Sequence, residues 1–129
     1  MEVHMKKRCI SAYVENQIGV LAKISGLFAG KNYNLDTLTV GETEDPTMSR
    51  MTIDLTCDDL TYEQIIKQLN RSVEVIKVID FTDMPIMKKE LLFIKVNSCK
   101  EADKQEIFRI AQTFDLLVVD YNRKSVLVQ

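Results

Sequence analysis

Apolar and polar residues follow two regular spacings along the chain, and these spacings predict its first elements. Residues 8–15 alternate with a period of two, which is typical of a half-buried strand. Residues 18–31 then repeat apolar side chains at helical spacing, and this stripe must face a core: Val20, Ile24, Leu27 and Phe28. The most regular alternation runs from Ser49 to Cys57. It predicts a strand with one face in the core and the other in water.

Three further segments complete the pattern of the first 82 residues. A strand runs from Tyr33 through Val40, and a capping box of Thr61 and Gln64 opens a second helix. Another strand covers 73–81. The order strand, helix, strand, strand, helix, strand lets two helices cover one face of a four-stranded antiparallel sheet, which predicts an α+β, ferredoxin-like βαββαβ domain.

A second unit follows the break at Asp83-Met84-Pro85. Its pattern predicts a strand over 90–96, a helix opened by a capping box of Ser98 and Glu101, and two short strands over 116–119 and 125–128. The unit stops one helix and one strand short of repeating the first, so we expect either a shortened chain or a sheet edge that a partner completes. The predicted organisation is a flexible lead, a first domain, a linker and an incomplete second α+β domain, over 1–7, 8–82, 83–87 and 88–129.

The start of the first helix is a candidate site for a small anion. Asn16 can cap the helix, and Gly19 falls in the first turn, where glycine costs roughly 0.5–1 kcal/mol relative to alanine. A residue without a Cβ lets a carboxylate approach the amides of Gly19, Val20 and Leu21 at the positive end of the helix dipole. The same residues also suit a plain helix start, and their spacing alone does not decide between the two.

The small residues of this helix form a second feature. Ala22, Gly26, Ala29 and Gly30 lie along one side and predict close packing against another element. Charged residues flank the segment and its length does not suit a membrane, so the Gly26 and Gly30 spacing is not interpreted as a membrane dimer motif.

Composition narrows the classes of function. The chain has 129 residues, 46% hydrophobic and 28% charged, with a net charge of -2, as expected for one compact domain or two small ones without general attraction to nucleic acid or anionic lipid. Its three cysteines form no C-x-x-C pair, and their odd number favours a reducing cytoplasm. We expect neither a signal peptide nor a membrane span.

No constellation for catalysis is present, because the only histidine, His4, lies in the predicted lead and no cysteine or serine has an activating partner. We expect no metal site either, since the acidic residues fall in turns. RNA-recognition modules share the predicted strand order, but they stack bases on aromatic residues of the central strands. The exposed positions of the 49–57 strand are Arg50, Thr52, Asp54 and Thr56, which makes an RNA-binding module a weak alternative.

Several motifs together resemble the regulatory (small) subunits of acetolactate synthase, which carry an N-terminal ACT domain. They are Val14-Glu15-Asn16-x-x-Gly19-Val20-Leu21, Gly26-Leu27-Phe28, Tyr33-Asn34-Leu35, Leu38-Thr39-Val40 and Asp45-Pro46-Thr47-Met48-Ser49-Arg50-Met51-Thr52-Ile53. The similarity covers nearly all of 8–82 and continues more loosely through 89–96 and 114–120. Two departures are Asn32, where the family usually has glycine, and a shorter C-terminal domain.

The resemblance implies a non-catalytic protein that activates a catalytic large subunit and confers feedback inhibition by valine or a related branched-chain amino acid. Thiamine diphosphate, Mg and FAD are expected only in the catalytic partner. The resemblance also implies a homodimer through ACT domains, with the effector between the first helix of one protomer and the second strand of the other. Asn16, Gly19, Val20 and Leu21 would hold its carboxylate and amine, and Asn34 and Leu35 of the partner would close the site. A stand-alone ACT-domain amino-acid sensor is the alternative.

Overall fold

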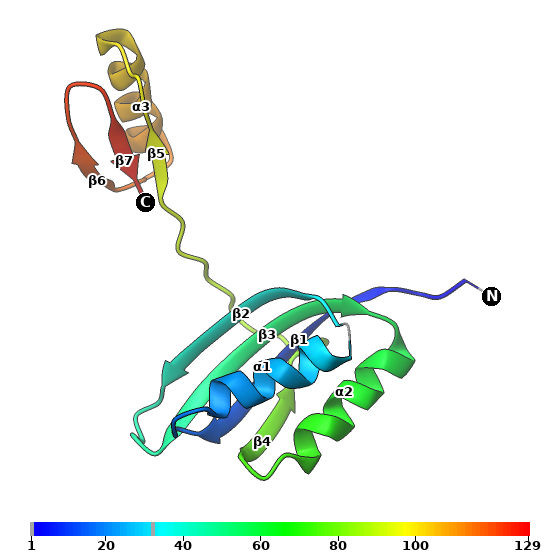
Figure 1. The fold of residues 1–129 in the computed structure, drawn as a ribbon. Coiled ribbons are helices and arrows are strands. Elements are labelled where there is room, and N and C mark those ends of the chain that lie inside the picture. Colours follow the sequence, from blue (N-terminus) through cyan, green and yellow to red (C-terminus); the bar gives the residue numbers. More distant parts are fainter. Residues whose placement is uncertain (1, 32) are drawn as a thin grey trace. The chain divides into compact units, whose positions relative to one another are not determined.

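The computed structural model describes residues 2–31 and 33–129 (Figure 1). The chain forms two compact units that divide between Ile86 and Met87. Asn32, where the resembled family usually has glycine, lies outside the described residues. No helix in the described ranges is long and apolar enough to cross a membrane.

The first unit is a four-stranded antiparallel sheet with two helices on one face (Figure 1). The strand order is β2-β3-β1-β4, which confirms the ferredoxin-like βαββαβ prediction. In chain order the elements are β1 (Lys6–Glu15), α1 (Val20–Gly30), β2 (Leu35–Glu42), β3 (Met48–Cys57), α2 (Asp59–Arg71) and β4 (Val75–Asp80). Strand β1 therefore begins within the predicted flexible lead.

The core lies between the helices and the sheet. The stripe predicted for α1 faces it, with Val20, Ile24 and Phe28 buried. Helix α2 adds Tyr62, Ile65 and Leu69, and the sheet contributes the alternating residues Ile10, Ala12, Val14, Met51, Ile53 and Leu55. The two spacings seen in the sequence thus meet in one apolar layer.

Strand β1 is buried on both faces, whereas a half-buried strand was predicted. It lies inside the sheet, and its Cys9 and Ser11, which face away from the helices, are also buried. Arg50 covers this part of β1, because its Nε donates to Ser11 Oγ at 3.0 Å and its guanidinium lies over the Phe81 ring. The backbone N–H of Phe81 donates to Cys9 O at 2.8 Å. Arg50 of β3, whose guanidinium lies over Phe81 just after β4, therefore shields a face that the pattern marks as polar.

Helix α2 begins earlier than predicted, and the predicted capping box is wrong. Its N-cap is Asp58, whose Oδ1 accepts from the Thr61 backbone N–H at 2.8 Å. Thr61 therefore lies inside the first turn. The next residue, Asp59, accepts a hydrogen bond from the buried Arg8 of β1, which lowers the pKa of that carboxyl and ties the helix start to the sheet.

The second unit is a three-stranded antiparallel sheet with one helix, formed by β5 (Ile94–Val96), α3 (Glu101–Thr113), β6 (Val118–Tyr121) and β7 (Val126–Val128). Strand β5 is shorter than the predicted 90–96, because Ile94 pairs with Val128 at the end of β7 and the residues before it extend past that strand. The predicted Ser98 cap is also wrong. Ser98 has a φ of 57°, and Asp103 instead accepts from the backbone N–H of the N-cap Lys100.

Candidate functional site

The turn between β1 and α1 ends in a glycine whose conformation explains its presence. Gly19 is the N-cap of α1, with φ 87° and ψ -10°, a left-handed conformation that costs most other residues roughly 1–2 kcal/mol. A Cβ built on Gly19 would meet nothing within 4 Å. Backbone conformation therefore favours glycine here, and the surface above it is open. The predicted N-cap, Asn16, is wrong.

Of the three backbone amides predicted to bind an anion, one already donates to the described part of the chain and two do not. The Val20 N–H donates to Gln17 O at 3.3 Å, and the Gly19 carbonyl accepts from the Lys23 N–H at 3.0 Å. Among the residues that the structure describes, none accepts a hydrogen bond from the backbone N–H of Gly19 or Leu21. These two amides, at the positive end of the α1 dipole, can donate to an anion.

Asn16 joins the turn to the hairpin between β2 and β3. Its Nδ2 donates to Pro46 O at 2.9 Å and to Glu42 Oε2 at 3.1 Å, while its Oδ1 accepts from Ser49 Oγ at 3.0 Å. The Asn16 backbone N–H donates to Thr47 O at 2.8 Å. Both side-chain N–H groups are therefore used inside the protomer, and Asn16 positions the turn.

Ser49 was missed as a site residue, although the sequence carried a signal. It is buried, and it occupies the core-facing series of β3 that continues through Met51 and Ile53. A hydroxyl in an apolar series needs a hydrogen-bond partner, and here that partner is Asn16.

The hairpin has its own internal hydrogen bonds. Asp45 Oδ1 accepts from the Thr47 N–H at 3.0 Å and from Thr47 Oγ1 at 2.7 Å, and these bonds lower the pKa of Asp45. Together with the Pro46 carbonyl and Ser49, they give a physical role to most of the Asp45 to Arg50 motif. The motif fixes the hairpin against the turn before α1 (Figure 1).

Asn34 and Leu35 lie at the other end of β2 from this turn. Leu35 pairs with Leu55 of β3, whereas Glu42, at the far end of the 8-residue strand, pairs with Ser49. At about 3.3 Å per residue the two ends are about 25 Å apart. One protomer therefore does not bring together the two halves of the predicted site.

Small and apolar residues are exposed on both α1 and β2, and we call them together the α1–β2 face. Leu21 is 48% exposed, Leu38 40% and Val40 38%, although Leu38 and Val40 pair with the buried Ile53 and Met51. It also includes Ala22, Gly26, Ala29 and Gly30, all exposed. Cβ atoms built on the two helix glycines meet nothing within 4 Å. The close packing predicted for these residues is not made within the first unit.

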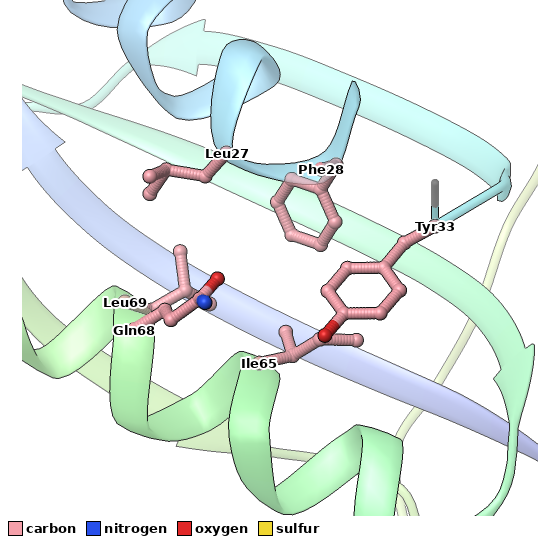
Figure 2. A pocket seen from close by; sticks show the side chains of 6 residues that line it. All are labelled: Leu27, Phe28, Tyr33, Ile65, Gln68 and Leu69. Atoms are coloured by element: carbon pink, nitrogen blue, oxygen red, sulfur yellow. The ribbon is translucent and has the colours of Figure 1, made fainter. Parts of the chain in front are cut away.

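A small hollow lies between α1 and α2 (Figure 2). It is lined by Leu27, Phe28, Tyr33, Ile65, Gln68 and Leu69. The side chains point toward one another and leave no room for a water molecule. This hollow is part of the core packing. No group of three or more His, Cys, Asp or Glu side chains that could hold a metal is found among the residues that the structure describes.

Comparisons with known proteins identify the family. Residues 10–77 match the model of the AHAS small subunit-like ACT domain, and residues 89–129 match the model of the small subunit of acetolactate synthase. The chain belongs to the family of acetolactate synthase small subunits. The resemblance stated from the sequence motifs is thereby confirmed.

Individual members of the small-subunit family are similar to this chain over nearly its whole length. The acetolactate synthase small subunit of Aquifex aeolicus is 41% identical over 125 residues, which cover 97% of this chain and 65% of that protein. The Bacillus subtilis small subunit is 41% identical over 124 residues, covering 95% and 72%. The crystal structure of the Thermotoga maritima small subunit aligns with a TM-score of 0.78 at 33% identity, covering 95% of this chain and 76% of that one. The chain therefore spans about two thirds to three quarters of the length of these relatives.

Proposed function

We propose that this chain is a non-catalytic regulatory subunit that activates the catalytic subunit of acetolactate synthase and makes it sensitive to valine or a related branched-chain amino acid. The observation that supports this most is the pairing of open amides at Gly19 and Leu21 with the uncovered α1–β2 face beside them. The open amides can bind a carboxylate, and the exposed apolar face is of the kind that marks an interaction site.

We propose that a second copy of the chain covers this face. Strand β2 is at the edge of the sheet, so its outer backbone groups can pair with another strand. Two β2 strands that pair antiparallel about a twofold axis between Leu38 and Thr39 would place Leu35 of the partner subunit opposite Glu42. Asn34 of the partner subunit would then lie next to the hairpin that Asn16 holds. The two halves of the site, about 25 Å apart within one protomer, would then lie next to each other across the interface.

The proposed effector is an α-amino acid whose carboxylate accepts from the amides of Gly19 and Leu21. Asn34 of the partner subunit would add a polar contact, and Leu35 of the partner subunit would contact the branched side chain. The Val20 amide could join only if its 3.3 Å turn hydrogen bond opened. An effector in this position touches both protomers, so its binding is linked to their relative arrangement.

Regulation follows if the catalytic subunit recognises one arrangement of the dimer better than the other. The coupling needed is typically 1–3 kcal/mol, which is a 5- to 150-fold change in affinity. We place thiamine diphosphate, Mg and FAD in the catalytic partner and assign no cofactor to this chain.

Reconstitution tests the proposal. The purified chain is added to its acetolactate synthase catalytic subunit, and acetolactate production is measured with and without valine, leucine and isoleucine. The expected result is a rise in activity on addition of the chain and a loss of that rise with one of the three amino acids. Binding of an amino acid without any effect on the catalytic subunit would favour the stand-alone sensor. Absence of both effects would refute the regulatory assignment.

A further inference from the structure

The second unit repeats part of the topology of the first. Its elements β5, α3, β6 and β7 follow the order of β1, α1, β2 and β3, and the sheet order β5-β7-β6 matches β1-β3-β2. All neighbouring strands are antiparallel in both. The loop between β5 and α3 is thus the counterpart of the turn that ends at Gly19.

The repeat extends to a backbone hydrogen bond that closes this region. In the first unit the Asn16 N–H donates to Thr47 O, and in the second the Cys99 N–H donates to Lys124 O, both at 2.8 Å. Asn16 directly follows β1 and Cys99 is the third residue after β5, so in each unit a residue shortly after the first strand is joined to the hairpin. The second unit therefore holds a loop and a hairpin together at the place where the first has its candidate effector site.

The side chains at this place in the second unit differ in charge. The first unit's hairpin segment carries Glu42, Glu44 and Asp45. The second unit has an open hollow of about 590 Å³ that we call the basic hollow, lined by Lys95, Asn97, Ser98, Asn122, Arg123, Lys124 and Ser125. Three of these seven side chains are cationic and none is acidic.

The three cations have no counter-charge in the described part of the chain. Lys104 and Arg109 of α3 pair with Glu101 and Glu106, whereas over 2–31 and 33–129 no carboxylate lies within ion-pair distance of Lys95, Arg123 or Lys124. Like charges gathered around one hollow repel each other, and a bound anion would relieve that repulsion.

Neutral donors complement the cations. Asn122 Oδ1 accepts from the backbone N–H groups of Lys124 at 2.8 Å and Ser125 at 2.9 Å. This fixes the side chain and leaves its Nδ2 available to donate. Ser98 and Ser125 add hydroxyl groups to the lining. Several cations with hydroxyl and amide donors suit the oxygens of a phosphate group, each of which accepts several hydrogen bonds.

We propose that the basic hollow, formed by the β5–α3 loop and the β6–β7 hairpin, binds a phosphate-bearing small molecule. It would be a second ligand site, separate in its residues and in its ligand charge from the amino-acid site of the first unit. Lys95, Arg123 and Lys124 supply the charge, and Ser98, Asn122 and Ser125 supply neutral donors.

Isothermal titration of the full chain with pyrophosphate tests this proposal, with inorganic phosphate and citrate as further probes. The triple variant Lys95→Gln, Arg123→Gln, Lys124→Gln should bind pyrophosphate at least tenfold more weakly than the natural chain. The matched control Lys31→Gln, Lys77→Gln, Lys89→Gln removes the same charge at exposed positions outside the hollow and should bind as the natural chain does.

Amide chemical shifts locate the ligand. Pyrophosphate should shift the signals of Ser98, Asn122 and Ser125 and leave those of Gly19 and Leu21 in place. The proposal is overturned if the natural chain does not bind pyrophosphate at millimolar concentration, if citrate binds as tightly as pyrophosphate, or if both triple variants lose binding equally. The last result would indicate attraction to net charge alone.

Discussion

Replacing Gly19 by aspartate or by asparagine separates the charge at the effector site from its backbone geometry. Asparagine and aspartate are nearly the same size, both tolerate the left-handed conformation better than most residues, and both are good N-caps. Nothing lies within 4 Å of the added Cβ, so neither should disturb the packing. Any difference between the two variants then reports the charge.

The magnitude follows from Coulomb's law. Two carboxylates about 6 Å apart at an effective dielectric constant of about 20 repel by roughly 3 kcal/mol, or about 100-fold in affinity. We therefore expect Gly19→Asp to bind valine about 100-fold more weakly than Gly19→Asn, while both variants still activate the catalytic subunit. Calorimetric titration and the activity assay with valine measure this. Equal affinity of the two variants would refute the assignment of the effector carboxylate to the start of α1.

Three further predictions test other parts of the structure. Gly26→Leu should raise the helix propensity of α1 by roughly 0.8 kcal/mol yet weaken self-association about tenfold or more, because its side chain would fill the α1–β2 face; sedimentation at several concentrations measures this. Ser49→Ala should weaken effector binding by roughly 0.5–1.5 kcal/mol by releasing Asn16, with titration as the assay. Asp58→Ala should lower the free energy of unfolding at neutral pH. Its hydrogen bond with Thr61 lowers the pKa of Asp58, so this stabilisation exists above the unfolded pKa of about 4 and is lost as the pH falls through the lower folded value. Urea unfolding at pH 7 and pH 3 should show the gap between the natural chain and the variant narrowing, whereas a constant gap would contradict this role.

The regular spacing of apolar residues was sufficient to predict the order of elements and the fold of the first unit. The core stripe of α1 and the alternation of β3 could be read directly because each follows a single period. The burial of β1 on both faces could not be predicted from a single period, because it depends on Arg50 and Phe81, which are distant in sequence.

The helix starts were harder to predict for a related reason. Local sequence does not decide which residue caps a helix: Asn16 and Ser98 precede α1 and α3, yet the N-caps are Gly19 and Lys100. Asn16 was predicted as a cap, but tertiary hydrogen bonds to the hairpin take its side chain elsewhere, and the left-handed Gly19 ends the turn. The turn at the start of α1 could be predicted from the sequence, whereas the role of Asn16 within that turn could not.

Mixed dimers test most directly whether one effector site is built from two protomers. Gly19→Asp damages the half at the start of α1, and Asn34→Asp damages the half at the start of β2, so neither homodimer should bind valine well. In a hybrid dimer one site carries both changes and the other carries none. We therefore predict that hybrids purified with two different affinity tags recover one valine site per dimer with the affinity of the natural chain. Hybrids that bind no better than either homodimer would contradict a site shared across the interface.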